Sequence, residues 1–280
     1  MNRLKLRHML EGFFMEDIGS FDVTSQLMFD KAQTGQGRIY MKEDGVFSGE
    51  QVIREGFHLI DEDIEIRMAV RDGETLGAGE TIATVTGPIP SILEGERVIL
   101  NLIQRMSGIA TLTRRAVNQL EGSPIKICDT RKTTPGLRMF EKYAVRCGGG
   151  VNHRLTLDGG VMIKDNHISM FGNILHAVDH VRNSLGPMTK IEVETESIDQ
   201  VKEAVEAGAD VIMFDNRTPD EIRDMVKHVP AHILTEASGG ITPDNIGSYR
   251  SCGVQFISLG SLTHSVKSVD ISLELEVGVE

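Results

Sequence analysis

The most constraining feature of this chain is a pattern of strands and helices that repeats from residue 125 to residue 261. Short runs rich in β-branched residues alternate with helical segments. The runs are "IKICDT" (125–130), "VMIKDN" (161–166), "KIEVET" (190–195), "DVIMFDN" (210–216), "HILTEASG" (232–239) and "QFISLGS" (255–261). Such alternation indicates βαβ units and a parallel sheet. We predict an α/β barrel over residues 111–265, and because we recognise six strands rather than eight, we expect it to be open.

Signals for helix starts support this interpretation. Ser197 with Gln200, and Thr218 with Glu221, have the spacing of a capping box, in which two side chains satisfy the first free N–H groups of a helix. The dipeptide at 242–243, Thr-Pro, places proline at a first helical position, where its missing N–H costs no hydrogen bond. We therefore predict helices after the strands at 190–195, 210–216 and 232–239.

Each predicted strand ends in a polar or charged residue. These residues are Asp129, Lys164, Glu194, Asp215, Glu236 and Ser261. In a βα-barrel the side chains at the carboxyl ends of the strands converge on the active site. The pattern therefore predicts a site at that end of the barrel, and the alternative is that these residues are solvated loop starts.

The first 110 residues have a different pattern. Residues 37–49 and 63–87 alternate between apolar and polar residues and are interrupted by glycines, which predicts antiparallel strands. Residues 51–60 and 94–120 have helical periodicity. We predict an N-terminal α/β sandwich domain over residues 1–110. For the tail, residues 266–280, we consider packing with this domain.

Charge and cysteine content limit the class of protein. The chain has 29 Lys and Arg against 41 Asp and Glu, a net charge of −12, which argues against a general binder of nucleic acid or of membrane surfaces. Its three cysteines form no CxxC pair, which favours a reducing compartment. The N-terminus lacks the apolar core of a signal peptide. We therefore predict a cytoplasmic protein.

One stretch opposes the acidic balance. Residues 131–154 contain six basic residues and one acid. Because partly buried cations repel one another and are costly to desolvate, a cluster of Arg131, Lys132, His153, Arg154 and Lys164 at the active-site end would require a polyanionic ligand. The alternative is a solvated basic surface, an interpretation that suits Arg138, Lys142 and Arg146 best.

Two glycine-containing loops follow the last two strands. "EASGGI" (236–241) and "SLGSLTHS" (258–265) each follow a strand end and precede a predicted helix. Backbone N–H groups in such loops, together with the dipole of the following helix, favour an anion. Barrels frequently bind phosphate with these two loops. We expect a phosphate site here, and the alternative is a pair of tight turns.

Glu194 and Asp215 end neighbouring predicted strands, so their carboxylates could face each other. One or two carboxylates near phosphate oxygens suit Mg²⁺. The alternative, which the spacing leaves equally open, is that both acids cap helices or neutralise nearby Lys and Arg.

The chain resembles the quinolinate phosphoribosyltransferase (carboxylating nicotinate-nucleotide pyrophosphorylase) family over nearly its whole length. The blocks that carry the resemblance are "ERVILNLIQRMSGIAT", "DTRKTTPGLR", "EKYAV", "GGGVNHR", "IKDNHI", "IEVE", "DNRTPDE", "EASGGI" and "SLGSLTHS", in this order. One difference is Phe21, where members often have Gly before the aspartate, and we expect a local loop change there.

The resemblance implies an N-terminal sandwich and an open seven-stranded α/β barrel, one strand more than we recognise. It implies the transfer of phosphoribose from phosphoribosyl pyrophosphate to quinolinate with decarboxylation, in NAD biosynthesis. It also implies a homodimer in which Arg97 enters the partner's active site, with association beyond the dimer left open.

The same resemblance implies a role for each matching residue. The residues expected to bind quinolinate and pyrophosphate are Arg97, Thr130, Arg131, Lys132, His153, Arg154 and Lys164. Glu194 and Asp215 would hold the ribose hydroxyls and Mg²⁺. The residues expected around the 5′-phosphate are Ser238, Gly239, Gly240, Gly260, Ser261 and His264.

Three other functions remain as alternatives. A paralogue of the same fold, such as the molybdenum-utilisation relatives, would transfer phosphoribose to another acceptor. A lyase would use Lys164 as a Schiff base, because cationic neighbours lower the pKa of a lysine. A nucleotide sensor would bind the same ligands without turnover.

Overall fold

The computed structural model describes residues 1–30 and 32–276. Contacts divide the chain into two compact units, one formed by Met1–Arg114, Pro135–Gly149 and Ser265–Glu280, and one by Arg115–Thr134 and Gly150–His264. Residues 135–149 therefore belong to the first unit, although they lie within 111–265. The domain limits drawn from the sequence, 1–110 and 111–265, stay a prediction.

The first unit is built on an antiparallel sheet with the strand order β12-β1-β5-β3. These strands are β1 (Thr34–Met41), β3 (Glu65–Met68), β5 (Thr81–Pro88) and β12 (Ile271–Glu276), and β2 (Gly45–Val46) pairs separately with β4 (Thr75–Leu76). The predicted antiparallel strands are thus confirmed. Because β12 pairs with β1, the described part of the C-terminal tail completes this sheet, and residues 277–280 lie outside the described residues.

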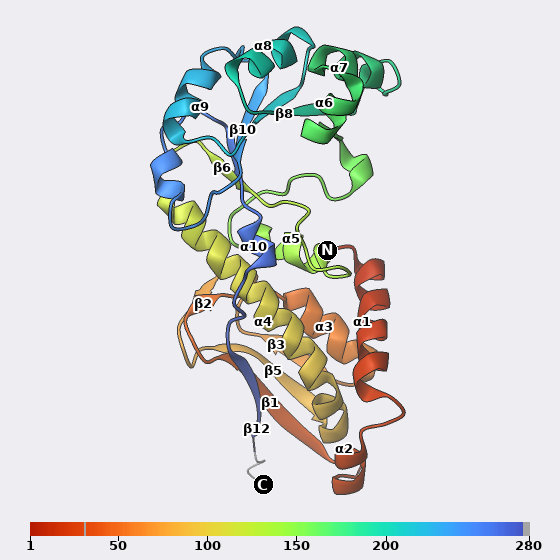
Figure 1. Ribbon diagram of the computed structural model, residues 1–280. Helices are drawn as coiled ribbons and strands as arrows, with labels where there is room; N and C mark the ends of the chain where they lie inside the picture. The colour runs from red at the N-terminus through yellow and green to blue at the C-terminus, as the bar shows by residue number, and fades with distance from the viewer. Residues whose placement is uncertain (31, 277–280) are drawn as a thin grey trace. The chain divides into compact units, whose positions relative to one another are not determined.

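The helices of the first unit are α1 (Arg3–Ile18), α2 (Val23–Met28), α3 (Glu50–Ile60), most of α4 (Ile89–Gln119) and α5 (Arg138–Cys147). Figure 1 shows α1 beside α3, and the contacts between the two helices agree. The sheet buries Ile39 and Met41, and α3 buries Phe57 completely. Full burial of one such side chain contributes about 1.5–3 kcal/mol. Phe21 lies in the exposed link before α2, whose N-cap is Asp22.

The second unit contains a parallel sheet with the strand order β6-β11-β10-β9-β8-β7. The strands are β6 (Lys126–Cys128), β7 (Val161–Ile163), β8 (Ile191–Thr195), β9 (Val211–Asp215), β10 (Leu234–Ser238) and β11 (Phe256–Ser258). All six match the runs recognised in the sequence. The α/β fold class, with a separate antiparallel sheet, is confirmed.

Val151 explains the strand that the sequence analysis does not recognise. It forms an isolated parallel bridge with Cys128 on the free side of β6. A single bridged residue between Gly150 and His153 has no β-branched run to reveal it. Among the described residues no ladder joins Val151 to β7, so the barrel is open at this point.

Short helices connect the strands of this sheet. They are α6 (Asp165–Phe171), α7 (Ile174–Arg182), α8 (Ile198–Glu206) and α9 (Pro219–Val226), and Figure 1 shows α7, α8 and α9 at the periphery, around the strands. Thr218 and Glu221 form the predicted capping box of α9. Ser197 caps α8, but the Gln200 side chain accepts from the backbone N–H of Glu196 and not from that of Ser197.

The prediction that a helix begins at residues 242–243 is wrong. That segment forms turns and then a short 3₁₀ helix, η2 (Ile246–Tyr249). Asn245 explains the difference, because its side chain accepts from the backbone N–H of Thr242 and donates to the carbonyl of Gly240. These local hydrogen bonds compete with the first turn of an α-helix.

Alternation along the strands separates the core from the barrel interior. On β8, Ile191 and Val193 are fully buried, whereas Glu192 and Glu194 line cavities. On β9 the same holds for Phe214, which is buried, and Asp215, which lines a cavity. Because successive side chains point to opposite faces of a strand, the apolar set packs under the helices and the polar set faces the interior.

The basic stretch is not a solvated surface throughout. Lys142 is 1% exposed in α5, so its assignment to a solvated basic surface is wrong, whereas Arg146 is exposed.

No helix in the described parts of the chain has the length and apolar character needed to cross a bilayer.

Candidate functional site

A cavity of about 670 Å³ lies within the second unit, at the carboxyl ends of its strands. It is lined by residues that follow or end β6 to β11. Fourteen of the residues predicted from the sequence line it: Thr130, Arg131, Lys132, His153, Arg154, Lys164, Glu194, Asp215, Ser238, Gly239, Gly240, Gly260, Ser261 and His264. The ends of the strands therefore converge on one pocket, as the sequence predicts.

The cationic part of this cavity is short of negative partners. Burial lowers the pKa of Arg154, and the neighbouring Arg131 lowers it further, while Glu192 acts in the opposite direction. Nε of Arg131 is buried and has no hydrogen-bond partner among the described residues. Guanidinium groups placed together in this way favour a planar anion, which accepts two hydrogen bonds from each.

The acidic part lies at the ends of β8 and β9. Nζ of Lys164 lies 2.8 Å from Oε2 of Glu194. Asp215 accepts a hydrogen bond of 2.7 Å from Nδ2 of Asn216. Asn216 is the one described non-glycine residue with a left-handed backbone, at φ 52°. Such a conformation costs about 1–3 kcal/mol, and here it turns the chain directly after the Asp215 carboxylate.

The two glycine-containing loops meet at the other side of the cavity. The Ser258 hydroxyl donates to Oγ of Ser238 at 3.0 Å, and Oγ of Ser261 is buried without a partner among the described residues. The helix after the second loop, α10 (Ser261–His264), has four residues. Because η2 after the first loop is also short, the helix dipoles expected to favour an anion are weaker than the sequence suggests.

Asp129 fixes the segment that carries His153 and Arg154. It is completely buried, and its carboxylate accepts from Nδ2 of Asn152 and from the backbone N–H of His153 at 3.0 Å. The side chain of Arg154 donates to the carbonyl of Gly160 at 2.7 Å. The short bridge at Val151 is thus extended by side-chain hydrogen bonds, which hold the segment beside the cavity.

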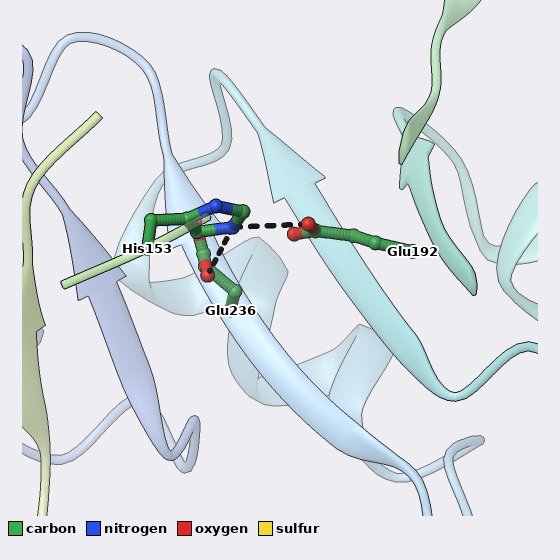
Figure 2. A group of neighbouring side chains, drawn as sticks. All are labelled: His153, Glu192 and Glu236. Atoms are coloured by element: carbon green, nitrogen blue, oxygen red, sulfur yellow. Dashed lines mark ion pairs between the residues drawn. The ribbon is translucent and has the colours of Figure 1, made fainter. Parts of the chain in front are cut away.

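His153 meets two buried acids in the barrel interior (Figure 2). Its Nε2 lies 3.0 Å from Oε2 of Glu192 and 3.5 Å from Oε2 of Glu236. We call His153, Glu192 and Glu236 the acid–histidine cluster. Burial raises the pKa of Glu236 to about 7, with a further contribution from the charge of Glu192. One carboxyl of the cluster therefore keeps its proton up to neutral pH.

Arg97 is the one predicted site residue that belongs to the first unit. It lies in α4, its side chain is 60% exposed, and its guanidinium lies 3.7 Å from a carboxylate oxygen of its neighbour Glu96. Its proposed role concerns a second copy of the chain.

The sequence analysis assigns no role to several residues that line the cavity. Asn216 and Ser258 are examples, and the cluster acid Glu192, which lines a neighbouring cavity, is a further residue without a predicted role. One signal was available, because Glu192 and Glu194 are two residues apart on a strand and therefore face the same side. For Asn216 there was none, since its backbone conformation is set by the loop.

A barrel with a cationic pocket, two carboxylates and two phosphate-type loops defines an enzyme that acts on phosphorylated, anionic substrates. Two family models describe the chain: "Quinolinate phosphoribosyl transferase, N-terminal domain" matches residues 22–107, and "Quinolinate phosphoribosyl transferase, C-terminal domain" matches residues 109–274. The chain belongs to the quinolinate phosphoribosyltransferase family.

Individual relatives agree with this family. The chain is 54% identical to a probable nicotinate-nucleotide pyrophosphorylase [carboxylating] of Bacillus subtilis, over 100% of this chain and 96% of that protein. It is 39% identical to a chloroplastic enzyme of the same name from Arabidopsis thaliana, over 93% of this chain and 80% of that protein. The crystal structure of NadC from Streptococcus pyogenes superposes with a TM-score of 0.95 at 37% identity, covering 99% of this chain and 98% of that one.

Proposed function

We propose that the cavity of the second unit binds quinolinate and phosphoribosyl pyrophosphate through the residues that line it. The chain is a quinolinate phosphoribosyltransferase, which joins these substrates and releases CO₂ and pyrophosphate to give nicotinate mononucleotide. The observation that carries the assignment of the site is the pair Arg131 and Arg154, two partly buried guanidinium groups that oppose each other's charge. A dicarboxylate removes this conflict.

The remaining lining residues divide between the pyrophosphate and the 5′-phosphate of phosphoribosyl pyrophosphate. Lys132 and Lys164 supply point charges for the pyrophosphate that leaves, and Ser238, Gly239 and Ser261 supply donors to the 5′-phosphate. The pyridine nitrogen attacks C1′ of the ribose as the bond to pyrophosphate breaks. Fixed cations that meet the developing charge, together with positioning of the two substrates, lower the barrier.

Glu194 and Asp215 are the candidates for Mg²⁺ and the ribose hydroxyls. Both carboxylates end adjacent strands and line the cavity, and oxygen donors of this kind fit Mg²⁺, which keeps waters and substrate oxygens as its other ligands. When bound, the ion would offset the negative charge of the pyrophosphate. Glu194 also holds Lys164, so that lysine stays close to the same substrate.

We also propose that the chain acts as a homodimer in the cytoplasm. The dimer is supported by Arg97, whose exposed guanidinium has an ion pair only with its sequence neighbour in the described structure. A cationic side chain of this kind can complete a site on a second copy. The compartment is supported by three cysteines, all in described parts of the chain, none of which forms a disulfide.

The proposal is tested by incubating the protein with quinolinate, phosphoribosyl pyrophosphate and Mg²⁺ and measuring CO₂ and nicotinate mononucleotide. Nicotinate serves as the second acceptor. If Arg131 and Arg154 hold both carboxylates, nicotinate leaves one cation unpaired, at a cost of about 2–5 kcal/mol. Comparable kcat/KM values for the two acceptors would contradict the dicarboxylate site.

Two alternatives are less well supported by the geometry. A Schiff-base lyase needs Lys164 to attack a carbonyl group, but Nζ of Lys164 is engaged in an ion pair with Glu194 at 2.8 Å. Borohydride would trap such an intermediate, and no trapping is expected. A sensor would bind quinolinate without producing CO₂, so the same incubation separates it from the enzyme.

A further inference from the structure

The acid–histidine cluster lies between two cavities of the second unit. His153 and Glu236 line the site cavity, and the whole cluster also lines a second cavity of about 640 Å³. That cavity is lined by Lys190, Val211, Leu234 and Phe256, at the amino ends of β8 to β11. The cluster therefore connects the floor of the site with space at the opposite end of the strands.

The tautomer of His153 follows from the contacts of its two ring nitrogens. The backbone N–H of Arg154 donates to Nδ1 at 2.9 Å, so Nδ1 uses its lone pair as an acceptor. The ring proton is then on Nε2, which faces Glu192 and Glu236. A metal ligand needs the lone pair of Nε2 and a proton on Nδ1. Although the three groups are close enough to surround an ion, this tautomer favours a proton in the cluster and not a metal.

Glu236 is the member of the cluster that is best placed to hold a proton. Its side chain is 3% exposed, and its Oε1 is buried without a partner among the described residues. The groups that face it are Glu192 on β8, His153 beyond Val151, Ser258 on β11 and Asp129 after β6. Two negative charges and burial outweigh the favourable contacts with His153 and Ser258, so the neutral carboxyl is stabilised.

The reaction of this family requires a proton from a donor that the sequence motifs do not name. When the carboxylate next to the pyridinium nitrogen leaves as CO₂, its C–C bond breaks and the electron pair stays on C2. A proton must then form the C2–H bond. We propose that the carboxyl group of Glu236 delivers this proton into the site cavity, and that a proton taken up from bulk solvent reaches the Glu236 carboxylate through the second cavity after each turnover.

Other acids of the site are less suited to this role. Lys164 is held by Glu194, and Asp215 accepts from Asn216 at the outer end of its strand. A carboxyl with a pKa near 7 is an efficient general acid at neutral pH. It also leaves behind an anion that the N–H of His153 can stabilise.

The test uses Glu236→Gln, which keeps the shape of the side chain and removes the acid. In a single turnover of the full-length enzyme, we expect pyrophosphate to appear at nearly the wild-type rate. Nicotinate mononucleotide should appear about 100-fold more slowly, because general acids contribute roughly 10²–10⁴-fold. If both products slow by the same factor, or if neither slows, Glu236 is not the donor.

The pH dependence supplies a readout that a structural role would not change. Wild-type turnover should decline as the pH rises through about 7, and Glu236→Gln should lose this decline. Glu192→Gln is the matched variant: the burial that mainly raises the pKa of Glu236 remains, but the added effect of the Glu192 charge is lost, so the decline should move to lower pH. A decline that stays in place in Glu192→Gln contradicts the proposal, even where Glu236→Gln does not fold.

Metal analysis tests the alternative occupant. After dialysis against a chelator, the wild-type protein should retain no zinc or other transition metal in stoichiometric amount. One tightly held ion per chain that is lost in Glu236→Gln would show that the cluster binds a metal, and the proton role would be wrong.

Discussion

The ammonium group of Lys164 and the carboxylate of Glu194 lie 2.8 Å apart, where the chain leaves two adjacent parallel strands, β7 and β8. The lysine side chain is 44% exposed and the glutamate 15%. Because water reaches the lysine, the pair contributes little to folding, in the range of 0–1 kcal/mol for exposed pairs. Both residues line the cavity, which is why we propose a role for the pair in catalysis and not in folding.

Lys164→Ala should therefore separate activity from stability. We expect kcat/KM to fall by on the order of 10²–10³-fold, the usual cost of removing a group that stabilises developing charge. The thermal midpoint should change by only a few degrees. Lys227→Ala is the matched control, since Lys227 pairs with Asp224 at 2.6 Å on the surface of α9, away from the cavity. Equal activity losses in both variants would contradict the role of Lys164.

Asp215→Asn tests the carboxylate pair. The amide keeps the size of the side chain, so folding should be preserved, but the charge that favours a divalent cation is lost. We expect activity on the order of 10²-fold lower and a higher Mg²⁺ concentration for half-maximal rate. A Mg²⁺ titration of wild type, Asp215→Asn and the surface variant Asp224→Asn measures this. Unchanged turnover at limiting Mg²⁺ would remove Asp215 from the site.

Gly239 and Gly240 allow the effects of two neighbouring glycine-to-alanine substitutions to be compared. Both have positive φ, at 84° and 65°, so alanine strains the backbone at either. At Gly239 a Cβ would also lie 2.8 Å from the backbone nitrogen of Asn216, whereas at Gly240 nothing lies closer than 4.0 Å. Gly239→Ala should lose about 1–3 kcal/mol more stability than Gly240→Ala, with a larger rise in KM for phosphoribosyl pyrophosphate. Urea unfolding and steady-state kinetics measure both effects.

The raised pKa of Glu236 predicts that the stability of the protein depends on pH even in the absence of substrate. Its folded pKa, about 7, is above its ordinary value of 4.5. The folded state therefore binds the proton more tightly than the unfolded state does. The stability that this binding adds is complete below pH 4.5 and is lost as the pH rises through about 7. Relative to Glu236→Gln, the wild-type free energy of unfolding should decrease between pH 4.5 and pH 7. Parallel urea curves for the two proteins across this range would show that the carboxyl is not perturbed.

Much of the fold could be predicted because the strands carry their own signal. β8, β9 and β10 combine β-branched residues that pack under the helices with a polar residue at the carboxyl end, and both features are visible in the sequence. The bridge at Val151 could not be found, because one paired residue has no periodicity. The missing helix at 242–243 has a different cause: Asn245 satisfies the backbone locally, and a proline signal does not reveal that competition.

The residues of the site could be predicted where they end strands or belong to family blocks. The burial and the contacts of each side chain could not be predicted. Whether Lys142 is buried, whether Asn216 is left-handed, and whether Glu192 and Glu236 share a space with His153 depend on contacts between segments far apart in the sequence. Those contacts decide the electrostatics, so the acid–histidine cluster emerged only from the three-dimensional structure.

The proposal that Arg97 acts on a second copy of the chain makes a quantitative prediction. Arg97→Ala lacks the donated guanidinium, and Lys164→Ala lacks a lysine of the barrel site. Each variant alone should be nearly inactive as a homodimer. When the two are mixed and allowed to exchange subunits, each heterodimer has one site with both defects and one site with neither.

Random pairing makes half of all dimers heterodimers. Because a two-fold interface places each contact twice, each heterodimer has one intact site of its two. The mixture should therefore recover about a quarter of wild-type activity. Differently tagged chains and size-exclusion chromatography verify that heterodimers form. Mixing Lys164→Ala with Asp215→Asn is the matched control: both defects belong to the same barrel, so exchange restores no intact site. If verified heterodimers of Arg97→Ala and Lys164→Ala recover no more activity than this control, Arg97 does not serve the partner's site.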